Sequence, residues 1–222
     1  VHKNNGILWT RDITNINQKN LSLCGPNTLV CITGYTQLLR VFFEQYIQHF
    51  THPIKLIIIE TDEYHLDAQW INHPKIIHIF GWNKPFLHSK VTALPIGLNC
   101  YRQWKIMANF LENEKMSEIT ETNPEYYKEI SKFKFVLSPP GAGIDCHRTW
   151  EVLYLGCIPI VESSTINELY EDLPVLVVAK WDDISKEFLE RKYEEIKIKR
   201  EKGEYNMDKL YIQYWLNLIK SN

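Results

Sequence analysis

One short stretch of the chain, residues 138–151, concentrates the side chains that could bind a phosphorylated ligand. It reads SPPGAGIDCHRTWE. Ser138 offers a hydroxyl, Gly141 and Gly143 let a backbone approach a ligand closely, and Arg148 can form two parallel hydrogen bonds with a phosphate. The chemistry that these residue types indicate is the binding of a diphosphate.

The second half of this stretch adds polar side chains on one side of a predicted helix start. Glu151 lies four residues after His147 and three after Arg148. A cation in the first helical turn opposes the helix dipole unless an anion lies nearby, and a carboxylate in the next turn could accept two hydroxyls of a ribose. The alternative is that Arg148 and Glu151 form an ordinary i,i+3 ion pair and that Gly141 and Gly143 only shape a turn.

The elements around this stretch are those of a parallel β-α-β unit. Residues 133–137 are an apolar run that ends before two prolines and a glycine, which predicts a buried strand. A helix is predicted from about Asp145, an N-cap residue type, to Gly156, and residues 158–161 are a second apolar strand. In such a unit the loop lies at the carboxyl edge of the sheet, where a helix N-terminus attracts anions.

A second group of polar residues follows the apolar strand predicted at 54–59. Glu60, Asp62, Glu63 and His65 lie there, and the rule that ligands bind at the carboxyl edge of an open α/β sheet predicts that they face the site. We choose Asp62 as the candidate general base, and the alternative is that Asp62 caps the next helix.

Two further positions are candidates for contacts with phosphate. His88 and Lys90 lie at the end of the N-terminal half, and either could contact phosphate or an acceptor. Ser163 ends the strand that follows the predicted helix.

The remaining apolar patterns predict alternating strands and helices, which is an α/β fold. Strands are predicted at 6–9, 28–33, 76–80, 91–96 and 173–178, and helices at 38–50, 186–202 and 207–219, the second with a cap at 183–185. Residues 101–127 are predicted to be a linker with a frayed helix. The alternating charges of 186–202 predict a solvated helix face.

Composition excludes some classes of function. The 222 residues are 45% hydrophobic and carry 25 basic against 27 acidic side chains, so no global field favours nucleic acid. No apolar stretch approaches the length of a membrane span. Five cysteines without a CxxC pair predict reduced thiols in a cytosol. The sequence starts at Val1 without Met, so an anchor or a lumenal location of a longer parent protein stays open.

Two segments carry a resemblance to a known family. The run S-P-P-G-x-G-x-D-C-H-R-T-W-E-x-L-x-x-G-C-I-P-I-V from Ser138 resembles the nucleotide-sugar-binding half of exostosin-like glycosyltransferases, and KVTALPIGLN at 90–99 looks like their domain junction. The closest likeness is to the small type found in microbes and large DNA viruses. Together the similar segments cover roughly 54–181.

This resemblance implies a GT-B fold, with two Rossmann-like domains facing across a cleft. The expected domains are an acceptor-side domain at 1–99, a nucleotide-sugar-binding domain at 100–205, and a C-terminal helix at 206–222 that crosses back to the first domain. The implied location is the cytoplasm, which is the host cytoplasm if the protein is viral.

The implied reaction is the transfer of a hexose or pentose from a nucleoside-diphosphate sugar to a hydroxyl of an oligosaccharide or glycoprotein, with inversion. A UDP-sugar is expected as donor, UDP-xylose or UDP-glucuronate among the choices. The candidate donor-binding residues are Lys90, Ser138, Gly141, Gly143, His147, Arg148, Glu151 and Ser163. Because the chain lacks the DxD triplet typical of metal-dependent transferases, we expect no metal and no other cofactor.

Two other classes of protein stay open. A carbohydrate-binding or scaffold protein with a decayed transferase fold would not need Arg148, Glu151 and an acceptor-side carboxylate together. A Rossmann enzyme that uses a dinucleotide or S-adenosylmethionine would carry its glycine motif after an early strand, whereas the glycines at 141 and 143 come late.

Overall fold

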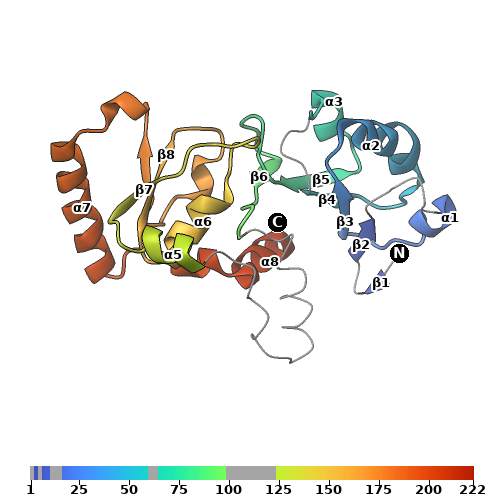
Figure 1. Cartoon of the computed structure of the whole chain (residues 1–222). Helices are drawn as coiled ribbons and strands as arrows, with labels where there is room; N and C mark the ends of the chain where they lie inside the picture. Colours follow the sequence, from blue (N-terminus) through green and yellow to red (C-terminus); the bar gives the residue numbers. More distant parts are fainter. Residues whose placement is uncertain (1–2, 5–6, 11–16, 60–64, 99–123) are drawn as a thin grey trace. The chain divides into compact units, whose positions relative to one another are not determined.

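The computed structural model describes residues 3–4, 7–10, 17–59, 65–98 and 124–222. Its contacts divide the chain into two compact units (Figure 1). The N-terminal unit comprises Val1–Pro95, Ala142–Ile144 and Leu218–Asn222, and the C-terminal unit comprises Ile96–Gly141 and Asp145–Asn217. Each unit is a mixed α/β structure built on a sheet with parallel strands. This is the α/β class that the alternating sequence pattern predicts.

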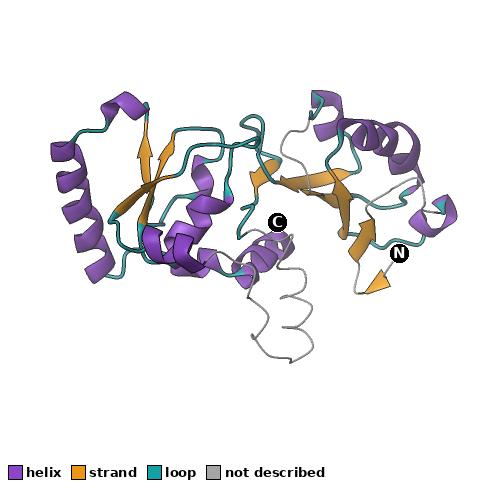
Figure 2. Ribbon diagram, viewed as in Figure 1, coloured by secondary structure: helices purple, strands orange, loops and turns teal. Residues whose placement is uncertain are grey.

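The N-terminal unit contains a six-stranded sheet, with its strands orange in Figure 2, and the strands lie in the order of the sequence. The strands are β1 (Lys3–Asn4), β2 (Ile7–Thr10), β3 (Thr28–Thr33), β4 (Ile54–Ile59), β5 (Ile76–Gly81) and β6 (Val91–Ala93). Among the described strand pairs, β1–β2 is antiparallel and the pairs from β2 to β6 are parallel. The sheet order therefore follows the chain without a reversal among the described strands.

This sequential order explains why the helices of the unit share one face of the sheet. Parallel strands are joined by right-handed crossovers, so strands added in one direction place their connections on one side. The described helical segments are α1 (Gln18–Leu21), α2 (Thr36–Val41), the π-helical η2 (Phe42–Tyr46), the 3-10 helix η3 (Ile47–His49) and α3 (Ala68–Ile71). Leu39, Phe42 and Phe43 belong to one buried cluster with Val30 and Leu56 of the sheet.

The opposite face of β4 meets the end of the chain. Lys55 is only 6% exposed, and its Nζ donates to the carbonyls of Ile219 (3.0 Å) and Lys220 (3.1 Å). These carbonyls belong to the last turn of α8 (Ile212–Ser221), where the helix dipole favours a cation. A buried charge on a strand thus fixes the C-terminal residues to the sheet.

The strand order bears on the residues predicted after β4. A ligand crevice in an open α/β sheet forms where the strand order reverses, since the neighbouring connections then leave on opposite faces. The described strands of the N-terminal unit show no such reversal. The crevice rule therefore does not by itself place a ligand beside Asp62.

The C-terminal unit contains a three-stranded parallel sheet in the order β7 (Phe135–Leu137), β8 (Ile158–Glu162) and β9 (Leu176–Val178). Helix α6 (His147–Tyr154) connects β7 to β8, as the sequence predicts. The other described helices of the unit are α5 (Pro124–Ile130), η5 (Asn167–Leu169), η6 (Trp181–Asp183), α7 (Lys186–Glu201) and η7 (Met207–Leu210), and α8 follows.

Both faces of this sheet are covered. Phe135 packs in a cluster with Ile160 and Ile196 of α7, whereas the next residue, Val136, packs with Ile130 of α5 and Val152 of α6. Successive strand residues point to opposite faces, so the two clusters lie on opposite sides of the sheet. The unit is a layered α/β/α structure, with α7 on one side and α5 and α6 on the other (Figure 1).

Helix α6 ends where the sequence predicts. Gly156 has φ of +76°, a left-handed conformation that favours glycine. The amide of Gly156 donates to the Leu153 carbonyl and that of Cys157 to the Val152 carbonyl, which is the Schellman pattern of helix termination. The chain then enters β8.

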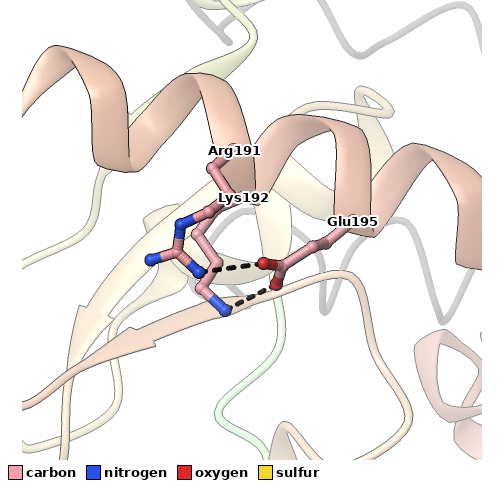
Figure 3. A network of polar contacts seen from close by, with 3 residues as sticks. All are labelled: Arg191, Lys192 and Glu195. Carbon is pink, nitrogen blue, oxygen red and sulfur yellow. Dashed lines mark hydrogen bonds and ion pairs between the residues drawn. The ribbon is translucent and has the colours of Figure 1, made fainter.

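Helix α7 has the solvated face that its charge pattern predicts. Arg191 and Lys192 both contact the carboxylate of Glu195 on the helix surface (Figure 3). The hydrogen bond from Lys192 and the charge of Arg191 lower the pKa of Glu195. Because the network lies on the surface and Arg191 and Glu195 are exposed, it adds little to stability. Among the described residues, no helix is long and apolar enough to cross a bilayer.

Candidate functional site

Ser138 is the first residue after β7, and its hydroxyl is buried. Its backbone amide donates to the Ile160 carbonyl (2.9 Å), which continues the ladder to β8. The side chain is 3% exposed, and its Oγ has no hydrogen-bond partner among the residues that the structure describes. A buried hydroxyl without a partner costs free energy, and such groups call for a ligand, a water or a functional reason.

Ser163 lies at the same edge of the sheet, directly after β8. Its amide donates to the Val178 carbonyl (2.8 Å), and its Oγ accepts a hydrogen bond from Asn167 Nδ2 (2.8 Å). Since β7 and β8 are parallel neighbours, Ser138 and Ser163 follow adjacent carboxyl ends. The structure thus brings these two predicted residues to one sheet edge.

The N-terminus of α6 opens toward this edge because the helix returns from the end of β7 to the start of β8. The N-cap residue is Cys146, which makes no side-chain cap hydrogen bond. Its Sγ instead lies 3.3 Å from Thr149 Oγ1. Without a capping side chain from Cys146, the helix start keeps its attraction for an anion.

The sequence predicted that Asp145 is the N-cap of α6, but the N-cap is Cys146. Asp145 instead forms a buried centre, which is a carboxylate surrounded by hydrogen-bond donors. It is 3% exposed and accepts hydrogen bonds from the amides of Ile96 (2.9 Å) and Cys146 (2.9 Å). Trp150 Nε1 (2.9 Å to Oδ2) and the Tyr170 hydroxyl (3.1 Å) also donate to it. The prediction was wrong because two buried aromatic donors need an acceptor, and a carboxylate can accept from all of them.

Burial is the strongest influence on the pKa of the Asp145 carboxyl. It raises the pKa of Asp145, against the effect of the four groups that donate to the carboxylate. Burial and the neighbouring Asp145 also raise the pKa of Tyr170. The centre joins the start of α6 to the chain at Ile96 and to the end of η5, so it fixes the helix N-terminus in place.

His147, the first residue of α6, contacts the segment that resembles a domain junction. Its Nδ1 lies 2.7 Å from the carbonyl of Gly97, so the tautomer that carries the proton on Nδ1 donates this hydrogen bond. In that tautomer Nε2 is an acceptor. Gly97 itself has φ of +67°. His147 is therefore oriented by the backbone of its own unit.

Arg148 and Glu151 are linked through two tyrosines of α5. Arg148 Nε donates to the Tyr126 hydroxyl (3.2 Å), which donates to Glu151 Oε2 (3.4 Å). The Tyr127 hydroxyl donates to Glu151 Oε1 (3.2 Å). The hydrogen bond to Tyr126 raises the pKa of Arg148, and the charge of Glu151 adds to this effect. The described contacts are thus a tyrosine bridge instead of the direct i,i+3 ion pair that the sequence left open.

The two glycines of the loop differ in what surrounds them. A Cβ added to Gly143 would lie 2.4 Å from Asn83 Nδ2, so this position accepts no larger residue without movement of Asn83. A Cβ added to Gly141 would meet no atom within 4 Å. Packing within the N-terminal unit accounts for Gly143, whereas the surroundings of Gly141 impose no requirement for glycine.

Lys90 and His88 belong to the N-terminal unit. Lys90 Nζ donates to the Ile76 carbonyl (3.2 Å) at the start of β5, and the Lys90 amide donates to His88 Nδ1 (3.0 Å). Lys90 thus binds at the amino end of its strand pair, whereas ligands of parallel sheets bind at the carboxyl end.

Asp62, Glu60 and Glu63 lie outside the described residues. His65 is described and exposed. The next described helix, α3, is capped by Asp67, whose side chain accepts from the Gln69 amide (3.0 Å). Capping the next helix was the alternative role for Asp62. For α3, that role belongs to Asp67.

No three His, Cys, Asp or Glu side chains gather as a metal site within the part of the chain that the structure describes. No known family model matches the chain, and no curated protein matches it either.

The site includes two residues that sequence reasoning missed, Tyr126 and Tyr127. They lie on α5, in a region predicted to be a linker with a frayed helix. The sequence Asn123-Pro124-Glu125 carries a signal for α5, since Asn is a common N-cap, Pro is favoured at the first helical position, and an acidic residue favours the first turn.

Proposed function

We propose that the chain is a glycosyltransferase that transfers a sugar from a nucleoside-diphosphate sugar to a hydroxyl of an oligosaccharide or glycoprotein, with inversion and without a metal. The donor is a UDP-sugar, with UDP-xylose or UDP-glucuronate as choices, and the arrangement is GT-B. The nucleoside, the sugar and the arrangement come from the resemblance to exostosin-like enzymes. The proposed location is the cytoplasm.

The observation that carries this proposal is the buried Ser138 hydroxyl without a described partner, at the strand end that leads into α6. A hydroxyl in this position can donate to a phosphate oxygen. The α6 N-terminus, which Cys146 does not cap with its side chain, supplies amide groups and a partial positive charge nearby in the chain. Both features suit the diphosphate of a nucleotide.

Arg148 and Glu151 have separate roles in this proposal. Arg148 neutralises the diphosphate as it leaves, which lowers the barrier to cleavage of the bond between the anomeric carbon and the phosphate oxygen. Glu151 accepts the ribose hydroxyls; a carboxylate has about four acceptor positions, so it can do this beside the two tyrosines. Ser163 follows the strand next to that of Ser138, and His147 is the first residue of α6.

Asp62 is the proposed general base. It takes the proton of the acceptor hydroxyl while the acceptor oxygen bonds to the anomeric carbon from the face opposite the diphosphate. The products are the glycoside with inverted configuration and the nucleoside diphosphate. The resemblance and the position of Asp62 after β4 support this assignment.

Ligand-dependent stability separates this function from the other two classes. A ligand that binds the native state at 100 times its Kd raises the unfolding free energy by about 2.7 kcal/mol. We expect UDP to raise the melting temperature, and NAD and S-adenosylmethionine to leave it unchanged. Stabilisation by NAD or S-adenosylmethionine alone would reject the proposal. Binding of UDP without turnover of any UDP- or GDP-sugar would instead identify a binding protein.

Substitutions of Arg148 and Glu151 test whether these residues form the donor site. Arg148→Ala should cost ~2 to 4 kcal/mol of transition-state stabilisation, because it removes a charge-assisted fork from the leaving diphosphate. Glu151→Gln should mainly weaken donor binding. Glu195→Gln is the matched control, since it neutralises a helix carboxylate that also accepts from two side chains, far along the sequence in α7. If Arg148→Ala and Glu151→Gln both turn over the donor like the wild type, the donor site is elsewhere.

A further inference from the structure

The hydroxyl of Tyr126, on α5, forms hydrogen bonds with two side chains of α6. Its hydroxyl accepts from Arg148 Nε (3.2 Å) and donates to Glu151 Oε2 (3.4 Å), so one group contacts both proposed donor-binding side chains. The described hydrogen bond of Tyr127 goes to Glu151 Oε1 (3.2 Å). The two rings lie edge to face, with centroids 5.1 Å apart.

The bond at Nε determines how Arg148 can meet an anion. A guanidinium carries five N–H donors in a plane, and the Nε donor is one of them. When Nε is held by Tyr126, the plane of the group is fixed and the two Nη nitrogens remain for a bidentate contact with a phosphate. Arg148 is exposed, so without this bond its side chain would have to be ordered by the ligand itself.

The direction of the hydrogen bonds is set by the two partners. Arg148 can only donate, and an ionised Glu151 can only accept. Tyr126 is the group between them that can accept one bond and donate the other. Phenylalanine at this position can do neither, although it preserves the ring that packs against the buried cluster of Ile130, Val152 and Cys157.

We infer that Tyr126 is a positioning residue that holds the Arg148 guanidinium and the Glu151 carboxylate in the arrangement that binds the diphosphate and the ribose of the donor. This inference rests on the proposed function. It assigns a role in the donor site to α5, an element outside the β7–α6–β8 unit. Tyr127 supports the Glu151 carboxylate.

The two tyrosines therefore differ in a way that one experiment can measure. Calorimetric titration of the full chain with inorganic pyrophosphate and with UDP gives the affinity for each probe in Tyr126→Phe, in Tyr127→Phe and in Arg148→Ala. We expect Tyr126→Phe to weaken pyrophosphate binding by about 5- to 10-fold, since a tenfold change equals about 1.4 kcal/mol and the bond to a charged group is of that order. We expect Tyr127→Phe, which removes a hydrogen bond to Glu151 Oε1, to weaken pyrophosphate binding less than Tyr126→Phe does.

A double-mutant cycle separates positioning from a general loss of structure. In the Arg148→Ala background, Tyr126→Phe should have no further effect on pyrophosphate binding, because its target is gone. Equal losses from Tyr126→Phe in both backgrounds, or wild-type affinity in Tyr126→Phe, would overturn the inference alone. Wild-type affinity in Arg148→Ala, or a wild-type chain that binds neither probe, would instead overturn the proposed donor site, and the inference with it.

A melting curve of each variant accompanies the titrations. Phenylalanine keeps the packing of the ring, so the melting temperature without ligand should stay close to that of the wild type. If Tyr126→Phe does not fold, Arg148→Lys tests the same bond from the other side, because lysine keeps the charge and lacks the Nε donor. Pyrophosphate affinity in Arg148→Lys equal to that of the wild type would then overturn the inference.

Discussion

Substitution of Ser138 by alanine should stabilise the protein without ligand and weaken its binding of UDP. The Ser138 Oγ is buried and has no partner among the described residues. A hydroxyl in that state costs about 1–3 kcal/mol relative to solvation in water, and alanine removes the hydroxyl while changing the packing volume by only one atom. We therefore expect the unfolding free energy of Ser138→Ala to rise by about 1 kcal/mol.

The assay compares thermal unfolding with and without UDP. For a chain of this length, about 1 kcal/mol corresponds to an increase of about 2–4 °C in melting temperature. With UDP present, the loss of one hydrogen bond to a charged phosphate should lower the affinity by about tenfold, which equals about 1.4 kcal/mol. Ser138→Ala should thus have the higher melting temperature without UDP and a smaller UDP-dependent increase.

Thr28→Val is the matched control, because Thr28 is also a buried hydroxyl residue at a strand but has a partner. Its Oγ1 donates to the Gly25 carbonyl (2.8 Å). Its replacement leaves that carbonyl without the bond and should destabilise the protein by about 1 kcal/mol. If Ser138→Ala destabilises the protein as Thr28→Val does, the Ser138 hydroxyl is already satisfied without ligand and the reasoning is refuted.

Three further predictions concern the reaction and the buried centre. Chelation by EDTA should leave the rate of sugar transfer nearly unchanged; a loss that manganese or magnesium restores would contradict metal independence. Asp62→Asn should lower turnover by ~10² to 10⁴ with donor affinity largely intact, because it removes the basic lone pair. Wild-type turnover of Asp62→Asn would assign the general-base role to Glu60, Glu63 or His65 instead. A product that NMR shows to retain the anomeric configuration of the donor would reject the single-base mechanism. For Asp145, burial raises the pKa above its usual value of 3.8, so between 3.8 and the raised pKa the native state binds more protons than the unfolded state. The stability that protonated Asp145 contributes is then fully present below pH 3.8 and falls as the pH rises through the raised pKa. The difference in unfolding free energy between the wild type and Asp145→Asn should therefore depend on pH in this window, and a constant difference would contradict the prediction.

The local elements of the fold could be predicted from the sequence because their signals are local. The apolar runs at β3, β4 and β8 identify strands, and the helical period between β7 and β8 identifies α6. Gly156 ends α6 since a left-handed residue is needed there and glycine adopts that conformation without strain. Ser185 caps α7 by accepting from the Phe188 amide, which the Asp183-Ile184-Ser185 signal predicts.

The partners of the polar side chains could not be predicted, because most of them come from segments far away in the sequence, such as Tyr170 and the Ile96 amide for Asp145 and Tyr126 for Arg148. A carboxylate before a helix is an N-cap residue type, and only the buried Trp150 and Tyr170 donors make Asp145 a buried centre. Arg148 and Glu151, three residues apart on a helix, match an ion pair by spacing alone. The tyrosines of α5 intervene because α5 packs on the same face of the sheet as α6.

The sequence by itself therefore determined the α/β class, the β7–α6–β8 unit and the set of side chains at the start of α6, since these depend on periodicity, turn residues and caps along a continuous segment. Only the tertiary structure decided that the strands of the N-terminal unit lie in sequence order, that Ser138 is buried without a described partner, and that Tyr126 bridges Arg148 to Glu151. Strand order and hydrogen-bond partners depend on packing between segments, and no local pattern encodes which buried donor meets which acceptor.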